Sequence, residues 1–129
     1  MITQTSTTRK SVLVVDDEPD VLAIIKSSLQ KSGFEVQGFT DSILALEHFQ
    51  QHSTSYDIVL SDIRMPGMNG FKFARSVRAA NSEIRIFLMT AFEMHKSELE
   101  KVLPSVRVDQ IIQKPVSMRE MVTTIEKSL

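Results

Sequence analysis

Residues 11–17 read S-V-L-V-V-D-D, a short apolar run that ends in two adjacent carboxylates. The run has no polar alternation, which is typical of a strand that helices cover on both faces of a parallel sheet. Similar runs recur at intervals of very roughly 25 residues, the spacing of strand, crossover helix and loop. The expected strands are Val12–Val15, Glu35–Phe39, Ile58–Leu60, Ile86–Met89 and Ile111–Ile112.

Amphipathic segments separate these runs and are typical of helices. A glycine follows the first segment where a helix commonly ends, and Ser117 with Glu120 forms a capping box at the start of the last one. Alternating strands and helices predict right-handed crossovers and a doubly wound α/β sandwich. The expected helices are 20–32, 42–51, 71–80 and one that begins after Ser117.

Length and composition narrow the class of protein. The 129 residues suffice for one domain. Fifteen basic and 16 acidic side chains argue against direct nucleic-acid binding, and no apolar run is long enough to predict a membrane span. The absence of cysteine excludes disulfides and thiolate metal sites. Residues 1–10 are polar and are expected to form a disordered lead-in without a secretion signal, ahead of a domain over 11–129 in a cytoplasmic protein.

The formal charge is divided unevenly along the chain. Residues 1–63 carry four basic and nine acidic side chains, whereas residues 64–129 carry eleven and seven. The acidic excess is concentrated around Asp16, Asp17, Glu18 and Asp20. This focus directs attention to the end of the first strand.

Four of the five apolar runs are followed by a polar residue that can do chemistry. These residues are Asp16 with Asp17, then Asp62, Thr90 and Lys114. In open α/β sheets, ligands bind outside the carboxyl ends of the strands, near the point where the strand order reverses. We therefore expect one site at that edge of the sheet.

Three carboxylates at neighbouring strand ends would repel one another unless a cation lies among them. Oxygen ligands of this kind suit Mg²⁺. A metal ion, the ammonium of Lys114 and the hydroxyl of Thr90 together suit the oxygens of a phosphoryl group. Asp62 is the best candidate for a nucleophile that forms an aspartyl phosphate, because the adjacent Asp16 and Asp17 serve more naturally as metal ligands.

Four ordered motifs give the chain a family resemblance. V-V-D-D-E-P (14–19), V-L-S-D-I-R-M-P-G-M-N-G (59–70), M-T-A (89–91) and Q-K-P (113–115) resemble the receiver domain of two-component response regulators. The resemblance covers about residues 11–128. It implies a CheY-like (βα)5 sandwich whose parallel sheet has the order 2-1-3-4-5.

The resemblance also implies a role for each site residue. Asp62 would be the phosphoacceptor, and Mg²⁺ would be bound by Asp17, Asp62 and the backbone carbonyl of Arg64, with Asp16 acting through a coordinated water. Thr90 resembles the switch hydroxyl and Lys114 the lysine that pairs with the phosphoryl group. The Lys114–Pro115 peptide looks like the cis bond of the family.

The implied function is a phosphorylation-dependent switch and not an enzyme with a separate substrate. A histidine kinase or histidine phosphotransfer protein would supply the phosphoryl group, and a downstream protein or effector domain would receive the signal. By resemblance the output surface comprises 94–103, 110–113 and 117–129, and a homodimer through this face is an expectation.

Three departures from the usual receiver pattern qualify the resemblance. Ile111 stands where the family commonly has Tyr or Phe, so the coupling of an aromatic ring to the threonine is in doubt. Pro104 is expected to end the fourth helix early. Phe92 and Arg64 flank the pocket at positions that the family uses to set the lifetime of the phosphoryl group.

Two other functions fit parts of the pattern. A haloacid-dehalogenase-like phosphohydrolase also uses Mg²⁺ and an aspartyl nucleophile, but it carries Asp-x-Asp where this chain has Asp16-Asp17. A degenerate receiver would act as a binding module without phosphorylation. His48 and His52 have the spacing of a two-histidine metal edge, but without a third ligand the sequence favours a structural role.

Overall fold

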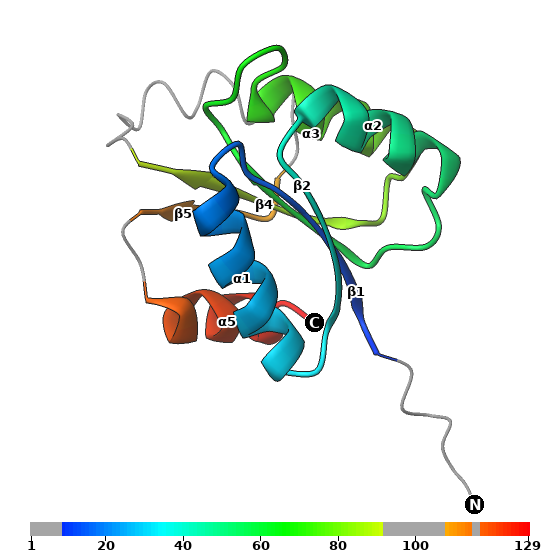
Figure 1. Cartoon of the computed structure of the whole chain (residues 1–129). Helices are drawn as coiled ribbons and strands as arrows, with labels where there is room; N and C mark the ends of the chain where they lie inside the picture. Colours follow the sequence, from blue (N-terminus) through cyan, green and yellow to red (C-terminus); the bar gives the residue numbers. More distant parts are fainter. Residues whose placement is uncertain (1–8, 92–107, 115–116) are drawn as a thin grey trace, which may run out of the picture.

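Five parallel strands form the central sheet of the computed structural model, which describes residues 9–91, 108–114 and 117–129 (Figure 1). The order across the sheet is β2-β1-β3-β4-β5, as expected. Each predicted strand is confirmed and is extended by at most two residues at either end. The strands are β1 (Ser11–Val15), β2 (Glu35–Phe39), β3 (Ile58–Asp62), β4 (Arg85–Thr90) and β5 (Gln110–Gln113).

The four predicted helices are also confirmed, and local side-chain caps explain where three of them begin. The side chains of Asp41, Asn69 and Ser117 each accept hydrogen bonds from backbone N–H groups in the first turn of the helix that follows. Gly33 follows the first helix with a φ of 96°, a conformation that suits glycine. The helices are α1 (Pro19–Lys31), α2 (Ser42–Gln51), α3 (Gly70–Ala80) and α5 (Met118–Lys127).

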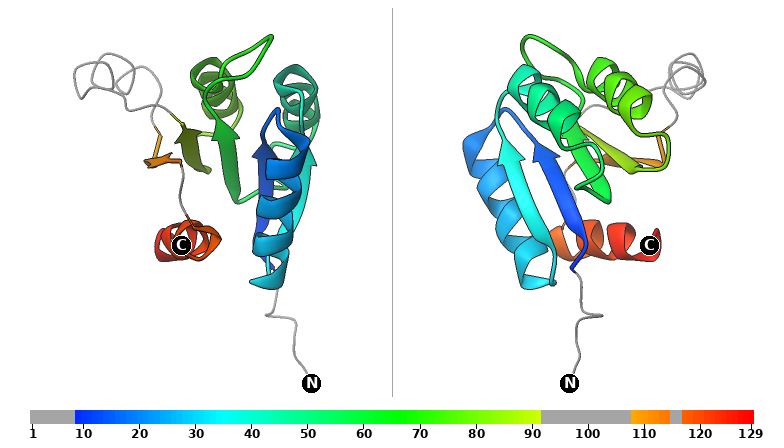
Figure 2. Two further views of the ribbon diagram at one scale, coloured as in Figure 1. Left: turned by 60° about the vertical axis from the view of Figure 1, so that its left-hand side comes forward. Right: turned by 90° about the vertical axis from the view of Figure 1, so that its right-hand side faces the viewer.

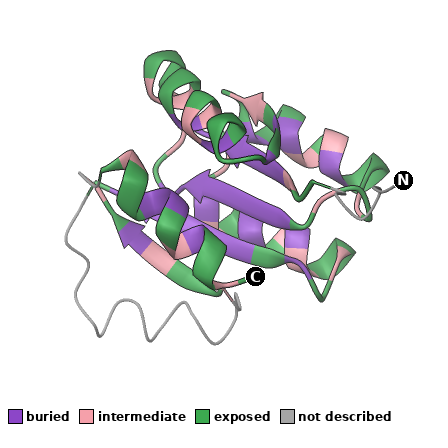
Figure 3. Cartoon of the chain, turned by 90° about the horizontal axis from the view of Figure 1, so that it is seen from below, coloured by how far each residue is buried: buried purple, intermediate pink, exposed green. Residues whose placement is uncertain are grey.

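The sheet separates two apolar cores. Helices α1 and α5 cover one face, and α2 and α3 cover the other (Figure 2). Alternate residues of β1 serve the two cores, with Val12 and Val14 in the first and Leu13 and Val15 in the second. Because both faces are covered, the central strands β1, β3 and β4 are mainly buried, whereas the edge strands β2 and β5 are partly exposed (Figure 3). This is the arrangement that the continuous apolar runs predict.

The strand order places the carboxyl ends of β1 and β3 side by side. Strand β1 pairs with β2 on one side and with β3 on the other, so the chain crosses back over β1 at this point. The edge of the sheet beside this reversal is where ligands bind in open α/β folds. No helix in the described ranges is long and apolar enough to cross a membrane.

Several expectations concern residues outside the described part of the chain. They are the disordered state of residues 1–8, the early end of a fourth helix over 94–103, the position of Phe92 beside the pocket and the cis peptide before Pro115.

Candidate metal and phosphoryl site

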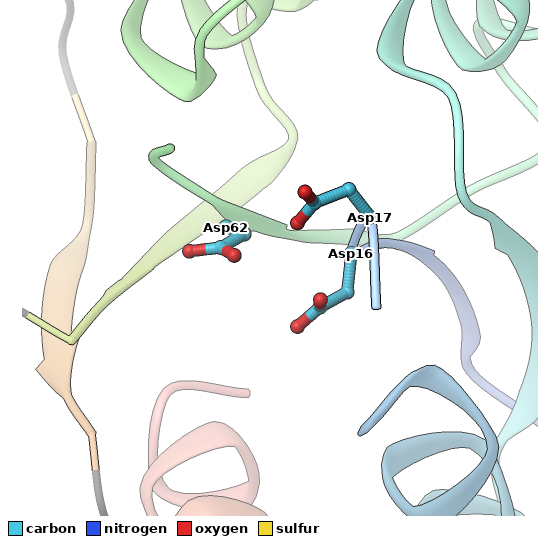
Figure 4. A group of neighbouring side chains, drawn as sticks. All are labelled: Asp16, Asp17 and Asp62. Atoms are coloured by element: carbon cyan, nitrogen blue, oxygen red, sulfur yellow. The ribbon is translucent and has the colours of Figure 1, made fainter. Parts of the chain in front are cut away.

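Three carboxylates converge at the carboxyl ends of β1 and β3. Asp16 and Asp17 follow β1 directly, and Asp62 is the last residue of β3. One carboxylate oxygen from each of the three lies within 4.8 Å of the others, and their side chains point into a shared space (Figure 4). Asp16 is fully buried, Asp62 is buried and Asp17 is half-buried. The structure therefore brings together the three acidic residues that the sequence predicts.

Lys114 supplies positive charge to this group from the end of β5. Its Nζ lies 3.0 Å from Asp16 Oδ2, to which it donates a hydrogen bond, and 3.6 Å from Asp62 Oδ2. The Lys114 backbone N–H donates to the carbonyl of Thr90 over 2.6 Å, which ties the ends of β4 and β5 together. Lys114 thus lies closer to Asp16 than to Asp62. The resemblance implies instead that Lys114 pairs with a phosphoryl group on Asp62.

Asp16 is the most completely bonded of the three carboxylates. Its Oδ1 accepts a hydrogen bond of 3.0 Å from the backbone N–H of Glu18, and its Oδ2 accepts the bond from Lys114. Its own backbone N–H donates to the carbonyl of Phe39 at the end of β2. These bonds fix Asp16 and make it a poor candidate for a nucleophile.

The surroundings of Asp62 shift the pKa of its carboxyl group upward. Burial raises the pKa of its carboxyl group, and the negative charges of Asp16 and Asp17 act in the same direction. The Lys114 ammonium and a hydrogen bond of 2.9 Å from the Ile63 N–H to Oδ1 oppose this rise without cancelling it. The surroundings of Asp62 therefore neutralise the charge of its ionised carboxylate only in part.

Lys114 shows the complementary effect. Burial alone would lower the pKa of its ammonium group, but the hydrogen bond to Asp16 and the charges of Asp16 and Asp62 outweigh burial and raise the pKa. Lys114 is therefore a fixed cation near neutral pH. Among the described residues, the Lys114 ammonium group forms ion pairs with two of the three carboxylates, Asp16 and Asp62.

The loop between β3 and α3 forms the outer wall of the site. Asp17 and Arg64 line the same surface pocket of about 350 Å³, together with Met65, Pro66 and Asn69. Gly67 adopts a φ of 83° within this loop, a conformation that suits glycine in a turn. Arg64 thus lies in the same pocket as Asp17, on the exposed side of the acidic group.

This donor set fits a hard divalent cation. The three carboxylates present only oxygen atoms, and their net charge requires a counter-ion. Mg²⁺ is bound in proteins by one or two carboxylates while it keeps several waters, which matches a site that is open on the side of Asp17. Asp17 and Asp62 are the residues best placed to bind Mg²⁺ directly, because Asp16 is more deeply buried.

Thr90 and Ile111 occupy the neighbouring strand ends. Thr90 ends β4 and is buried, next to the strand that carries Asp62. Ile111 in β5 is half-buried and packs against the core under α2 and α3. The aliphatic side chain therefore fills the place that the resemblance associates with an aromatic ring.

Sequence reasoning missed two serines near the site. The buried Ser61 hydroxyl donates to the backbone carbonyl of Asp62 over 2.9 Å, and the buried Ser42 hydroxyl donates to the carbonyl of Met68. A serine inside an apolar strand is a signal for Ser61, because a buried hydroxyl needs a partner. The contact of Ser42 has no local signal, since its partner lies 26 residues away.

The two histidines of α2 do not converge on a metal site. Their rings stack 4.4 Å apart; His48 Nε2 lies 2.6 Å from the Tyr56 hydroxyl, and His52 Nδ1 lies 2.8 Å from the His48 carbonyl. These contacts engage one nitrogen of each ring within the protein. The structural role that the sequence favours agrees with this geometry.

Two curated relatives are similar in sequence to most of this chain. The chain is 35% identical over 120 residues to the sensory transduction protein RegX3 of Mycobacterium tuberculosis, which covers 92% of the chain and 50% of RegX3. It is 28% identical to the response regulator receiver protein CpdR of Brucella abortus, covering 93% of the chain and 97% of CpdR. The chain thus spans about half the length of relatives such as RegX3 and nearly all of CpdR.

Solved structures and a family model identify the family of this chain. The chemotaxis protein CheY4 of Vibrio cholerae superposes with a TM-score of 0.84 at 27% identity, covering 95% of this chain and all of CheY4. The response regulator TrrA of Thermotoga maritima, solved in complex with Mg²⁺-BeF, gives a TM-score of 0.80 at 32% identity, covering 93% and 99%. The family model described as the response regulator receiver domain matches residues 12–126. The chain belongs to the response regulator receiver domain family.

Proposed function

We propose that this chain is a phosphorylation-controlled switch that accepts a phosphoryl group on Asp62. Receiver domains are signalling modules and not conventional enzymes. The observation that carries the proposal is the convergence of three carboxylates at the carboxyl ends of β1 and β3, two of which pair with the Lys114 ammonium group at the end of β5. This arrangement has the charge to hold Mg²⁺ and a nucleophile beside it.

Asp62 is the proposed acceptor because its surroundings leave it available. Both oxygens of Asp16 accept hydrogen bonds, whereas Asp62 Oδ2 is 3.6 Å from Lys114 and has no closer polar contact of its own in the described structure. Its raised pKa, caused first by burial, indicates an oxygen whose negative charge is poorly stabilised. Binding of a cation next to Asp62 relieves that condition.

The proposed reaction moves one phosphoryl group from a phosphohistidine to Asp62. A carboxylate oxygen of Asp62 forms a bond to phosphorus, the bond between phosphorus and the histidine nitrogen breaks, and that nitrogen keeps the electron pair. Lys114 neutralises charge on the transferring group, and the Thr90 hydroxyl contacts it after transfer. When bound, Mg²⁺ would supply further charge neutralisation, held by Asp17, Asp62 and the Arg64 carbonyl, with Asp16 acting through water.

The partners follow from this chemistry. A histidine kinase or histidine phosphotransfer protein would donate the phosphoryl group, and the added charge would shift the output surface formed in part by β5 and α5. A downstream protein or effector domain would bind that surface, and a homodimer would use it as well. We place the switch in the cytoplasm and the domain at 11–129, after a lead-in over 1–10.

Two alternatives are weighed against this proposal. The match of the receiver family model to residues 12–126 argues against a haloacid-dehalogenase-like phosphohydrolase. A degenerate receiver that binds partners without phosphorylation is compatible with Ile111. It accounts less well for the retained Asp16, Asp17, Asp62 and Lys114.

Mass spectrometry of the intact protein tests the proposal. Incubation with acetyl phosphate and Mg²⁺ should add the mass of one phosphoryl group to the wild type and to Asp57→Asn, and none to Asp62→Asn. Asp57 is a suitable control because it is exposed and bonds to the Ser11 N–H at the opposite end of the sheet. An unmodified wild type would favour the degenerate receiver, and repeated turnover of a small phosphoester would favour the phosphohydrolase.

A further inference from the structure

The first turn of α2 contains one buried hydroxyl group, that of Ser42. Ser42 is 1% exposed, and its Oγ donates to the backbone carbonyl of Met68 over 2.7 Å. The start of the helix is itself fixed, because Asp41 Oδ1 accepts hydrogen bonds from the N–H groups of Ile43 and Leu44. The Ser42 hydroxyl is therefore a rigid donor presented to the loop between β3 and α3.

That loop contains Arg64, and backbone hydrogen bonds fix both of its ends. At the first end, the Ile63 N–H donates to the carbonyl of Met89 over 2.9 Å. At the second end, the Gly70 N–H donates to the carbonyl of Ile63 over 2.7 Å. A Cβ atom on Gly70 would lie 2.8 Å from Ile63 Cα and would collide with the Asp62 carbonyl, so glycine is required for this approach.

Between its ends the loop rests on the first turn of α2. A Cβ atom on Gly67 would lie 3.2 Å from Ile43 Cδ1, which shows how closely the helix approaches the turn. The Ser42 hydroxyl bonds to Met68 one residue later. Arg64, Pro66, Gly67 and Asn69 are exposed, whereas Met65 and Met68 are half-buried and pack against the core. The hydrogen bond from Ser42 adds a directional polar contact to this packing.

We propose that Ser42 is a positioning residue for the metal and phosphoryl site. By holding Met68, it keeps the loop backbone at Arg64 facing Asp17 across their shared pocket. The inference rests on the proposed function, since it assumes that this pocket binds Mg²⁺. It adds to that function a residue of α2 that does not touch the metal or the phosphoryl group.

The physical basis is the entropy of the loop. Without the hydroxyl, the Met68 carbonyl loses its buried donor, and the loop gains conformations in which Arg64 no longer lines the pocket that it shares with Asp17. Cation binding must then select the ordered conformation again, which weakens the apparent affinity. Loss of one neutral hydrogen bond corresponds to a change of about fivefold in Mg²⁺ affinity.

The experiment is a Mg²⁺ titration of the purified full chain, followed by amide chemical shifts in nuclear magnetic resonance spectra. Ser42→Ala should bind Mg²⁺ about fivefold more weakly than the wild type. Ser42→Cys, which keeps the shape of the side chain but offers a weak donor, should fall between them. Ser128→Ala removes a hydroxyl that donates to the Ile125 carbonyl over 2.7 Å in α5, and it should bind Mg²⁺ like the wild type.

Phosphorylation kinetics separate positioning from a general loss of structure. With acetyl phosphate, Ser42→Ala should be slower than the wild type at limiting Mg²⁺ and should reach a similar rate at saturating Mg²⁺. If Ser42→Ala and Ser42→Cys only lower the melting temperature and bind Mg²⁺ like the wild type, the inference is wrong. A wild type that binds Mg²⁺ but accepts no phosphoryl group would instead contradict the proposed function alone.

Discussion

Two clusters of charged side chains lie at opposite ends of the sheet and have opposite charge balances. At the carboxyl end, Asp16, Asp17 and Asp62 face Lys114. At the other end, Asp109 pairs with Arg78 and Arg85 at 3.6 Å each, and its Oδ2 accepts a hydrogen bond of 2.7 Å from the Ile86 N–H. The first cluster therefore groups three carboxylates around a lysine, whereas the second holds one carboxylate between two guanidinium groups.

The difference indicates what each cluster contributes. Asp109 closes the start of the β4–β5 ladder, because its backbone N–H also donates to the Ile86 carbonyl over 2.8 Å. Every one of these contacts stabilises the fold. At the site, burial of repelling carboxylates costs stability that a bound cation recovers, which is typical of a functional site. Charge balance and burial together distinguish the two clusters.

The largest expected effect is on the phosphoryl transfer rate. Lys114→Met should slow phosphorylation by acetyl phosphate about 100-fold, because one preorganised charge in such a site has about that effect. Arg85→Met removes a cation from the Asp109 cluster and should leave the rate unchanged. The measurement is a time course by mass spectrometry at a temperature where circular dichroism shows both variants folded. Equal phosphorylation rates in the two variants would show that the two clusters do not differ in their contribution to phosphoryl transfer.

The second effect concerns stability at the Asp109 cluster. Asp109→Ala should lower the free energy of unfolding by about 1–3 kcal/mol, because the Ile86 N–H loses its acceptor and two guanidinium groups lose a partner. Urea unfolding measures this loss. Asp109→Asn retains an oxygen acceptor and should lose less, and a loss as large as that of alanine would assign the effect to charge alone.

The third effect has the opposite sign. Asp62→Asn should raise the melting temperature by a few degrees in the presence of a chelator, because it removes a buried charge beside Asp16 and Asp17. The gain should shrink when Mg²⁺ is added, since the metal stabilises only the wild-type cluster. Differential scanning calorimetry tests this, and a lower melting temperature without Mg²⁺ would show that Asp62 is already neutralised.

The smallest effect is expected on the pH dependence of stability, at His48 in α2, which belongs to neither cluster. Burial lowers the pKa of His48, and the neighbouring His52 adds to this shift. The folded state therefore binds the His48 proton less tightly than the unfolded state, so stability is lost as the pH falls below the ordinary histidine pKa of about 6.5. Unfolding free energies at about pH 7.5 and about pH 5.5 should differ less in His48→Gln than in the wild type. An unchanged difference would exclude His48 as a source of pH dependence.

The strands could be predicted because their signal is local. The apolar runs that follow Ser11 and Asp57 are continuous, and the structure buries both of their faces. Even the interrupted run at Gln37 and Gly38 forms β2, because the sheet supplies its partner in β1. The ends of the strands differed by one or two residues, since pairing with a neighbour extends a strand beyond its apolar part.

The acidic site could be predicted in part for the same reason. Parallel strands carry whatever follows them to one edge, so Asp16 and Asp62 had to lie near each other once β1 and β3 were neighbours. The preference of Lys114 for Asp16 could not be predicted. It depends on a difference between 3.0 and 3.6 Å that the packing of β5 determines.

By itself, the sequence determined which residues form strands and helices and which chemistry collects at the strand ends. Both follow from patterns a few residues long, because apolar periodicity and strand-end polarity act locally. Only the tertiary structure decided that Lys114 bonds to Asp16, 98 residues away, and that Ser42 supports the loop at Met68. Such contacts join segments that the crossovers bring together, so their geometry exists only after the sheet has assembled.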